Sequence, residues 1–137
     1  MILESLIPAA HAQGASDVHL EPGLPAAVRV RGALKIAGDP VSPQALVAAA
    51  QELVGPDWPH FLERRSYDCS RNIRGIRCRI NVLQSSRGIG LAIRILTSFS
   101  VSLDKLNLHP DLRRLIAPTQ GLVIVTGATG SGKSTTV

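Results

Sequence analysis

The sequence predicts an α+β fold, in which a mainly antiparallel sheet with flanking helices is followed by the beginning of a parallel α/β domain. Three observations lead to this prediction. Polar and apolar residues alternate in several segments before residue 97, as half-buried strands require. Stretches with apolar residues at helical spacing lie between these segments. Near residue 122, a continuous apolar run leads directly into a glycine-rich loop.

Length and composition describe a soluble globular protein. The 137 residues suffice for one core and part of a second, and 45% hydrophobic against 18% charged residues argues against disorder. The net charge of +5 comes mostly from arginines, several of which lie between residues 64 and 94. Such a cluster is either an ordinary solvated face or a surface for phosphates, nucleic acid or acidic lipid.

The first 36 residues predict one helix and three short strands. An apolar stripe ends before Gly14 and predicts an amphipathic helix, with Ile2, Leu3, Leu6, Ile7 and Ala10 on one face. Pro8 removes a backbone hydrogen bond, so we expect this helix either to kink or to begin near Ile7. The segment lacks the length and the basic flank of a secretory or membrane-spanning segment. Alternation then predicts strands over residues 17–21, 27–31 and 34–36, with a turn at Gly32.

Two helices and three further strands follow. Ser42 and Pro43 form a helix start, and the buried stripe of this helix is predicted as Leu46, Val47, Ala50, Leu53 and Val54. A shorter helix would hold Trp58, Phe61 and Leu62. Strands are predicted over residues 67–70, 75–83 and 90–96, with Arg77, Arg79 and Arg94 on the face opposite the apolar residues.

The two cysteines, Cys69 and Cys78, fit no metal-binding spacing, which favours reduced thiols. If residues 72–75 close a hairpin, the two thiols lie nearly opposite each other, so a disulfide remains an alternative. The sequence leaves this choice open.

Three parts organise the chain: a first domain over residues 1–97, a linker over 98–102, and residues 103–137, which begin a second domain. This last part predicts two short helices and a strand over residues 122–125. The strand is apolar throughout, as in a parallel sheet that is covered on both faces.

The loop after this strand fits the phosphate-loop pattern G-x-x-x-x-G-K-[ST]. Glycines allow its backbone N–H groups to face phosphate oxygens, Lys133 would reach the terminal phosphates, and Ser134 would bind magnesium. The predicted nucleotide-binding residues are Gly127, Ala128, Thr129, Gly130, Ser131, Gly132, Lys133, Ser134 and Thr135. Hydrolysis also needs a carboxylate and a water-orienting residue, which we expect beyond residue 137. We therefore expect this chain to contain no catalytic residue and to be inactive alone.

Four motifs in order resemble the secretion ATPases, the superfamily of type IV pilus assembly and retraction motors and type II secretion ATPases. They are ASDVHLEP at residues 15–22, VRVRGAL at 28–34, RCRINV at 77–82, and GLVIVTG at 121–127, which leads into the loop. The resemblance covers nearly the whole chain but does not separate the pilus branch from the secretion branch. It implies a PAS-like first domain followed by the truncated start of a RecA-like ATPase domain.

The same resemblance implies a hexameric cytoplasmic motor that uses ATP and magnesium at an inner-membrane pilus or secretion platform. It also implies that arginines of the first domain reach the nucleotide phosphates, with Arg79 and Arg94 as the matching positions and Arg77 as a weaker one. Asp17, His19 and Glu21 alternate on one strand, for which we expect hydrogen bonds or an interface rather than a metal.

Two other functions remain open. The chain is alternatively a stand-alone module that docks on a secretion motor or membrane platform, or a basic nucleic-acid-binding domain. The scarcity of aromatic residues, 3% of the chain, speaks against base stacking and therefore against nucleic acid. An unpaired strand over residues 122–125 would also favour a dimer of the chain.

Overall fold

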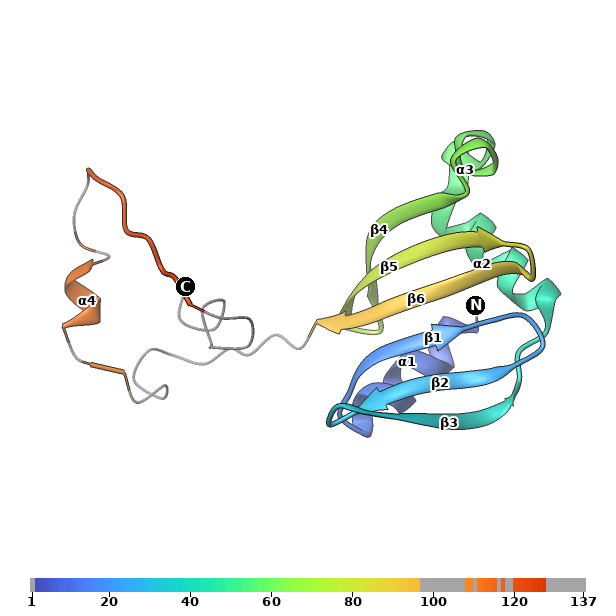
Figure 1. Ribbon diagram of the computed structural model, residues 1–137, viewed down its shortest axis with the longest axis horizontal. Helices are drawn as coiled ribbons and strands as arrows, with labels where there is room; N and C mark the ends of the chain where they lie inside the picture. Colours follow the sequence, from blue (N-terminus) through green and yellow to red (C-terminus); the bar gives the residue numbers. More distant parts are fainter. Residues whose placement is uncertain (1, 97–107, 110, 116, 118–119, 128–137) are drawn as a thin grey trace. The chain divides into compact units, whose positions relative to one another are not determined.

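The computed structural model describes residues 2–96, 108–109, 111–115, 117 and 120–127 (Figure 1). The chain divides into two units, Met1–Thr97 and Ser98–Val137. The functional assignment of these units and of the linker remains a prediction.

The first unit consists of three α-helices, a short 3-10 turn and six strands. In chain order they are α1 (Leu3–Ala12), β1 (Ala15–Leu20), β2 (Pro25–Val30), β3 (Ala33–Pro40), α2 (Pro43–Val54), η1 (Gly55–Asp57), α3 (Trp58–Arg64), β4 (Ser66–Ile73), β5 (Ile76–Ser85) and β6 (Gly88–Leu96). Each of the six strands that the sequence predicts before residue 97 is present, and each is longer than predicted because cross-strand pairing extends it.

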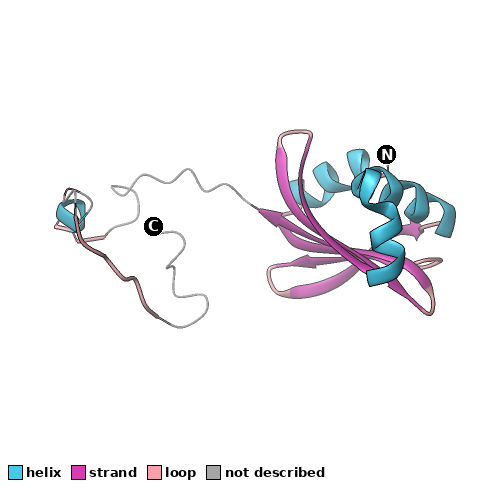
Figure 2. Cartoon of the chain, turned by 90° about the horizontal axis from the view of Figure 1, so that it is seen from above, coloured by secondary structure: helices cyan, strands magenta, loops and turns pink. Residues whose placement is uncertain are grey.

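All six strands form one antiparallel sheet in the order β3-β2-β1-β6-β5-β4. The centre of the sheet is the pair β1–β6, which joins the first strand of the chain to the last. Figure 1 looks onto the sheet with α1 and α2 behind it, and Figure 2 shows the helices on one side of the strands. The predicted α+β class, with an antiparallel sheet and flanking helices, is confirmed.

Two hairpins close through the same two-residue turn. Arg31–Gly32 and Arg74–Gly75 all have positive φ angles, between 49° and 84°, as a type I′ turn requires. The second turn sets the β4–β5 register, which pairs Cys69 with Ile80 and Cys78 with Arg71. The thiols are therefore diagonal rather than opposite, and both are free.

Pro8 does not delay the first helix. Helix α1 begins at Leu3 and continues through Pro8 to Ala12, so the expectation of a start near Ile7 is wrong. Proline removes only one hydrogen bond here, and burial of Leu3, Ile7 and Ala10, each at most 2% exposed, compensates for the loss.

Helix α2 begins as predicted, because the Ser42 hydroxyl accepts a hydrogen bond from the Ala45 amide at 3.2 Å. Its buried stripe differs at one position: Ala49 is buried, whereas Val47 is 37% exposed. In α3, Phe61 is buried, but Leu62 is 48% exposed. Short helices bury a narrow stripe, and an apolar residue at its margin stays in solvent.

In the second unit, α4 spans Leu112–Leu115. Residues 122–127 form no strand, which differs from the sequence prediction, and Leu122 and Ile124 are 82% and 71% exposed. A strand requires hydrogen-bonded neighbours, and no strand within the described residues pairs with this segment. Residues 128–137, with most of the phosphate loop, lie outside the described residues.

Burial predicts the cost of truncating two leucines. Leu53, on α2, is 1% exposed, whereas Leu62, on α3, is 48% exposed. We expect Leu53→Ala to lower the free energy of unfolding by about 2–5 kcal/mol and Leu62→Ala by less than about 1 kcal/mol. Urea denaturation followed by circular dichroism measures both. Equal losses would contradict the assignment of Leu53 to the core.

Candidate functional site

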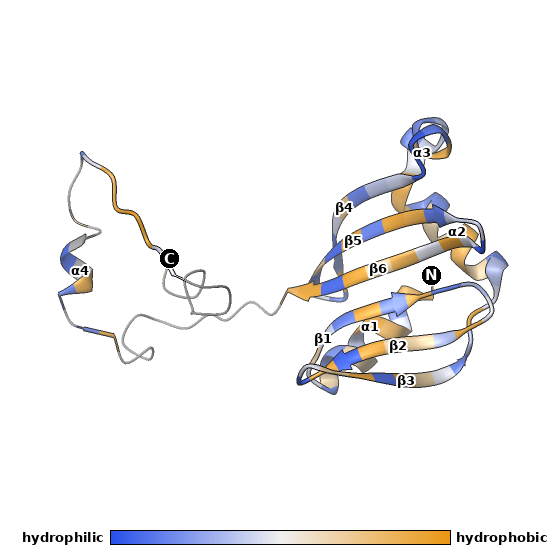
Figure 3. Cartoon of the chain, in the orientation of Figure 1, coloured by the Kyte–Doolittle hydropathy of each residue, from blue (hydrophilic) through white to orange (hydrophobic). Residues whose placement is uncertain are grey.

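The face of the sheet that α1 and α2 do not cover carries the predicted arginines. Along β5, Cys78, Ile80 and Val82 are fully buried, so the alternate residues point to the opposite face. Figure 3 shows this alternation of hydrophobic and hydrophilic residues along β5. In β6, the same alternation buries Ile93 and Ile95 and exposes Arg94. We call this surface the open face.

The register of the sheet brings two of the three arginines together. Arg79 of β5 lies directly opposite Arg94 of β6, and Arg77 lies opposite Leu96. The side chains of Arg79 and Arg94 are 67% and 70% exposed. Like charges directly opposite each other destabilise a sheet, so this pair has a cost that packing does not explain. An anion bound between them would relieve it.

Two carboxylates flank the arginine pair. The Arg94 Nε donates a hydrogen bond to Asp17 Oδ1 at 3.1 Å, and Arg79 Nε lies 3.8 Å from Asp68 Oδ1. Asp17 also lies opposite Arg29 in the sheet, with 3.7 Å between Oδ2 and Nε. Across β1, β6, β5 and β4 the order is therefore acid, base, base, acid, in which Asp68 is diagonal to Arg79 because Ser70 lies directly opposite it. Arg77 makes no ion pair within the described residues.

Asp17 is the most enclosed charged group of this row, because its side chain is only 17% exposed. Burial by itself would raise the pKa of this carboxyl. The hydrogen bonds from Ser16 and Arg94, together with the charges of Arg94 and Arg29, outweigh burial and hold the pKa below its ordinary value of 3.8. Asp17 is therefore ionised at neutral pH.

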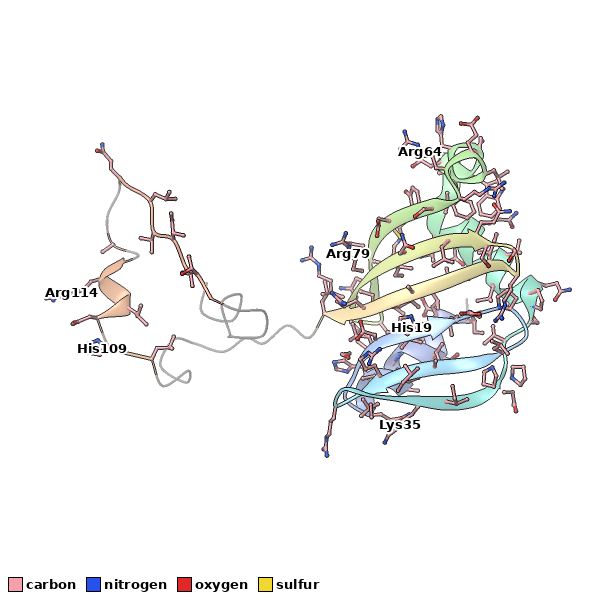
Figure 4. All side chains as sticks on the ribbon, in the orientation of Figure 1. His19, Lys35, Arg64, Arg79, His109 and Arg114 are labelled. Carbon is pink, nitrogen blue, oxygen red and sulfur yellow. The ribbon has the colours of Figure 1, made fainter. Side chains whose placement is uncertain are left out.

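Asp17, His19 and Glu21 do not share one site, because each faces a different partner. Asp17 pairs with arginines, Glu21 lies 3.3 Å from Arg87, and His19 lies opposite Ala92 in the register (Figure 4). Among the residues that the structure describes, no three acidic, histidine or cysteine side chains converge as a metal site. Sequence reasoning missed the arginine partners of Asp17, which alternation within one strand cannot reveal.

A hollow of about 300 Å³ continues the open face beyond His19. Its lining includes Glu21, Leu83, Arg87, Gly90 and Ala92. At Gly90 a Cβ atom would lie 3.0 Å from the Leu20 carbonyl oxygen, so a side chain there would crowd the neighbouring strand. Polar and apolar residues line the hollow together.

The two thiols contribute no reactive nucleophile. Burial raises the pKa of both Cys69 and Cys78, which disfavours the thiolate. Of the predicted phosphate loop, the structure describes only Gly127, so the predicted roles of Lys133 and Ser134 fall outside the described part. No helix in the described part is long and apolar enough to cross a membrane.

The lowered pKa of Asp17 predicts a pH dependence of stability. The ionised carboxylate contributes stability above its ordinary pKa of 3.8, and this contribution disappears as the pH falls through the lower folded-state value. We expect Asp17→Asn to cost about 1.5 kcal/mol at pH 7, the lower end for a hydrogen bond to a charged group because Arg94 is exposed. The cost should shrink progressively below pH 3.8.

Urea denaturation between pH 7 and pH 3 measures this difference. Asp39→Asn is the matched control, since Asp39 is exposed and makes no ion pair within the described residues. A cost for Asp17→Asn that stays constant over this range would show that its charge does not contribute.

Comparisons with known proteins agree with this architecture. The family model described as "Type II/IV secretion system protein" matches residues 1–137. The type IV pilus retraction ATPase PilT of Pseudomonas aeruginosa is 36% identical over 131 residues, which cover 91% of this chain and 37% of that protein. The type II secretion system ATPase E of Vibrio cholerae is 30% identical, with 99% of this chain and 30% of that protein covered.

A crystal structure of the pilus retraction motor PilT with bound ADP superimposes with a TM-score of 0.85 and 32% identity, over 98% of this chain and 40% of that one. The chain thus spans less than half the length of the relatives that it matches. The family match over the whole sequence and the identity to PilT show that this chain belongs to the type II/IV secretion system protein family.

Proposed function

We propose that this chain forms part of an ATPase motor for type IV pilus retraction or assembly, or for type II secretion, in which the open face contacts nucleotide phosphates. One observation carries the proposal: Arg79 and Arg94 lie directly opposite each other on an exposed sheet face. Guanidinium groups bind phosphate oxygens in a bidentate manner and stay charged at every physiological pH. The residues present therefore fit a phosphate group.

The phosphate loop completes this proposal. Residues 127–135 would surround the phosphates through backbone N–H groups, Lys133 would neutralise the terminal phosphates, and the Ser134 hydroxyl would bind magnesium. ATP and magnesium are then the cofactors of the motor. Arg77 points to the same face but lies opposite Leu96 rather than another arginine, so it is the weakest of the three candidate arginine ligands.

The names of the relatives support the cellular role. Both pilus ATPases and type II secretion ATPases are among the relatives, with a pilus retraction ATPase 36% identical and a type II secretion ATPase 30% identical. We propose a hexamer that works in the cytoplasm at an inner-membrane pilus or secretion platform. The surplus of arginines over carboxylates on the open face serves nucleotide phosphates in this proposal rather than nucleic acid.

Substitution of the arginines tests the proposal in the full-length protein. Removing one preorganised donor to a transferring phosphoryl group typically slows turnover by about 10²-fold, and we expect this from Arg79→Ala and from Arg94→Ala. Steady-state ATP hydrolysis provides the measurement, and thermal melting checks the fold. Arg64→Ala on α3, also an exposed arginine, is the matched control (Figure 4). Turnover at the parental rate in both variants would show that these arginines form an ordinary solvated surface and do not contact the nucleotide.

A further inference from the structure

We propose that Asp17 and Asp68 are positioning residues: they hold Arg94 and Arg79 by their Nε groups and leave the terminal N–H groups of each guanidinium for a phosphate group. This inference rests on the proposed function, because it specifies how the open face would present its arginines. Nothing in the proposed role of the arginines alone requires these carboxylates.

Each of the two arginines faces a carboxylate through Nε, Arg94 in a hydrogen bond and Arg79 in a longer ion pair. In each, the flanking carboxylate lies nearest to Nε, at 3.1 Å for Arg94 and 3.8 Å for Arg79. Within the described residues, no hydrogen bond is made by a terminal nitrogen of these two side chains. By contrast, Arg29, Arg71 and Arg87 each donate a hydrogen bond from a terminal nitrogen, at 3.1 Å, 2.7 Å and 3.3 Å respectively. Away from the open face, Arg74 contacts Glu4 through Nε at 2.9 Å, so this form of contact is not confined to the open face.

A guanidinium group that is held at Nε keeps its two terminal nitrogens available for a ligand. The group is planar and rigid, so a contact at Nε restricts the plane in which the two terminal nitrogens lie. Phosphate binds best to a pair of parallel N–H groups, and the terminal nitrogens supply such a pair. The carboxylates thus orient the arginines without occupying the groups that bind the anion.

The order of charges across the sheet places the carboxylates outside and the arginines, which would bind the anion, in the middle. Asp17 on β1 and Asp68 on β4 lie outside, whereas Arg94 on β6 and Arg79 on β5 lie between them. Each carboxylate therefore reduces the repulsion between the arginines from the side away from their partner. The middle of the row retains an excess of positive charge, where an anion would sit.

The two supports differ in strength. Asp17 is 17% exposed and accepts a further hydrogen bond from the Ser16 hydroxyl at 2.8 Å. Asp68 is 58% exposed, and its ion pair is longer. Because an exposed ion pair contributes little, we expect loss of the Asp17 carboxylate to matter more than loss of the Asp68 carboxylate.

The first test observes the support without any ligand. In nuclear magnetic resonance spectra of the 137-residue chain, the Nε–H proton of Arg94 should exchange with water more slowly than that of Arg64. Asp17→Asn should remove this difference. Exchange of the Arg94 proton as fast as that of Arg64 in the parent chain would overturn the inference, whatever the arginines bind.

The second test measures the affinity for inorganic triphosphate by titrating the same resonances. We expect Asp17→Asn to weaken binding about tenfold, within the range of coupled contacts, and Asp68→Asn to weaken it less. Because Asp17 acts through Arg94, the double variant Asp17→Asn/Arg94→Ala should bind no more weakly than Arg94→Ala alone. Thermal melting of each variant checks that the sheet is folded. Ser16→Ala, which removes the hydrogen bond to Asp17 and a longer one to the Arg29 carbonyl, should weaken binding slightly.

The outcomes separate this inference from the proposed function. If Arg94→Ala weakens binding but Asp17→Asn does not, or if the two losses simply add, Asp17 does not position Arg94 and the proposed function stands. If neither Arg94→Ala nor Arg79→Ala changes the affinity, the anion site itself is absent and both proposals fail. Unchanged affinity in Arg64→Ala shows that the loss is specific to the open face.

Discussion

Burial of one sheet face under the helices is the constraint on which the candidate site depends. Side chains along a strand alternate between faces, so burial of Cys78 and Ile80 places Arg79 on the opposite face. The buried Ile93 and Ile95 fix Arg94 in the same way. A slip of one residue in either strand would exchange the two faces, and the hydrophobic core therefore holds the arginines in position.

The open face is a compromise between stability and binding. Two arginines in direct register repel each other, and this repulsion costs stability. Asp17 and Asp68 reduce this cost and equal the two arginines in number, but the two positive charges still lie side by side in the middle of the row. Because Asp17 and Arg94 are separated by 77 residues, their contact also joins the β3-β2-β1 half of the sheet to the β6-β5-β4 half. The site thus lies where the two halves meet.

Local patterns were sufficient to predict the strands and the face of each arginine, because both follow from alternation within a single strand. The partners of these arginines were not predictable, since the register across β1 and β6 depends on pairing between distant segments. The predicted helix start near Ile7 was wrong for a related reason: the packing of α1 compensates for the backbone hydrogen bond that Pro8 removes. The apolar segment at residues 122–125 reads as a strand, but strand formation requires partners that a local pattern does not contain.

The central claim is that Arg79 and Arg94 contact nucleotide phosphates. A structure of the full-length protein with magnesium and a non-hydrolysable ATP analogue tests it most directly. The account predicts terminal guanidinium nitrogens of both residues within about 3 Å of phosphate oxygens, with Asp17 still at the Arg94 Nε. A nucleotide bound at residues 127–135 with both arginines in solvent would contradict it.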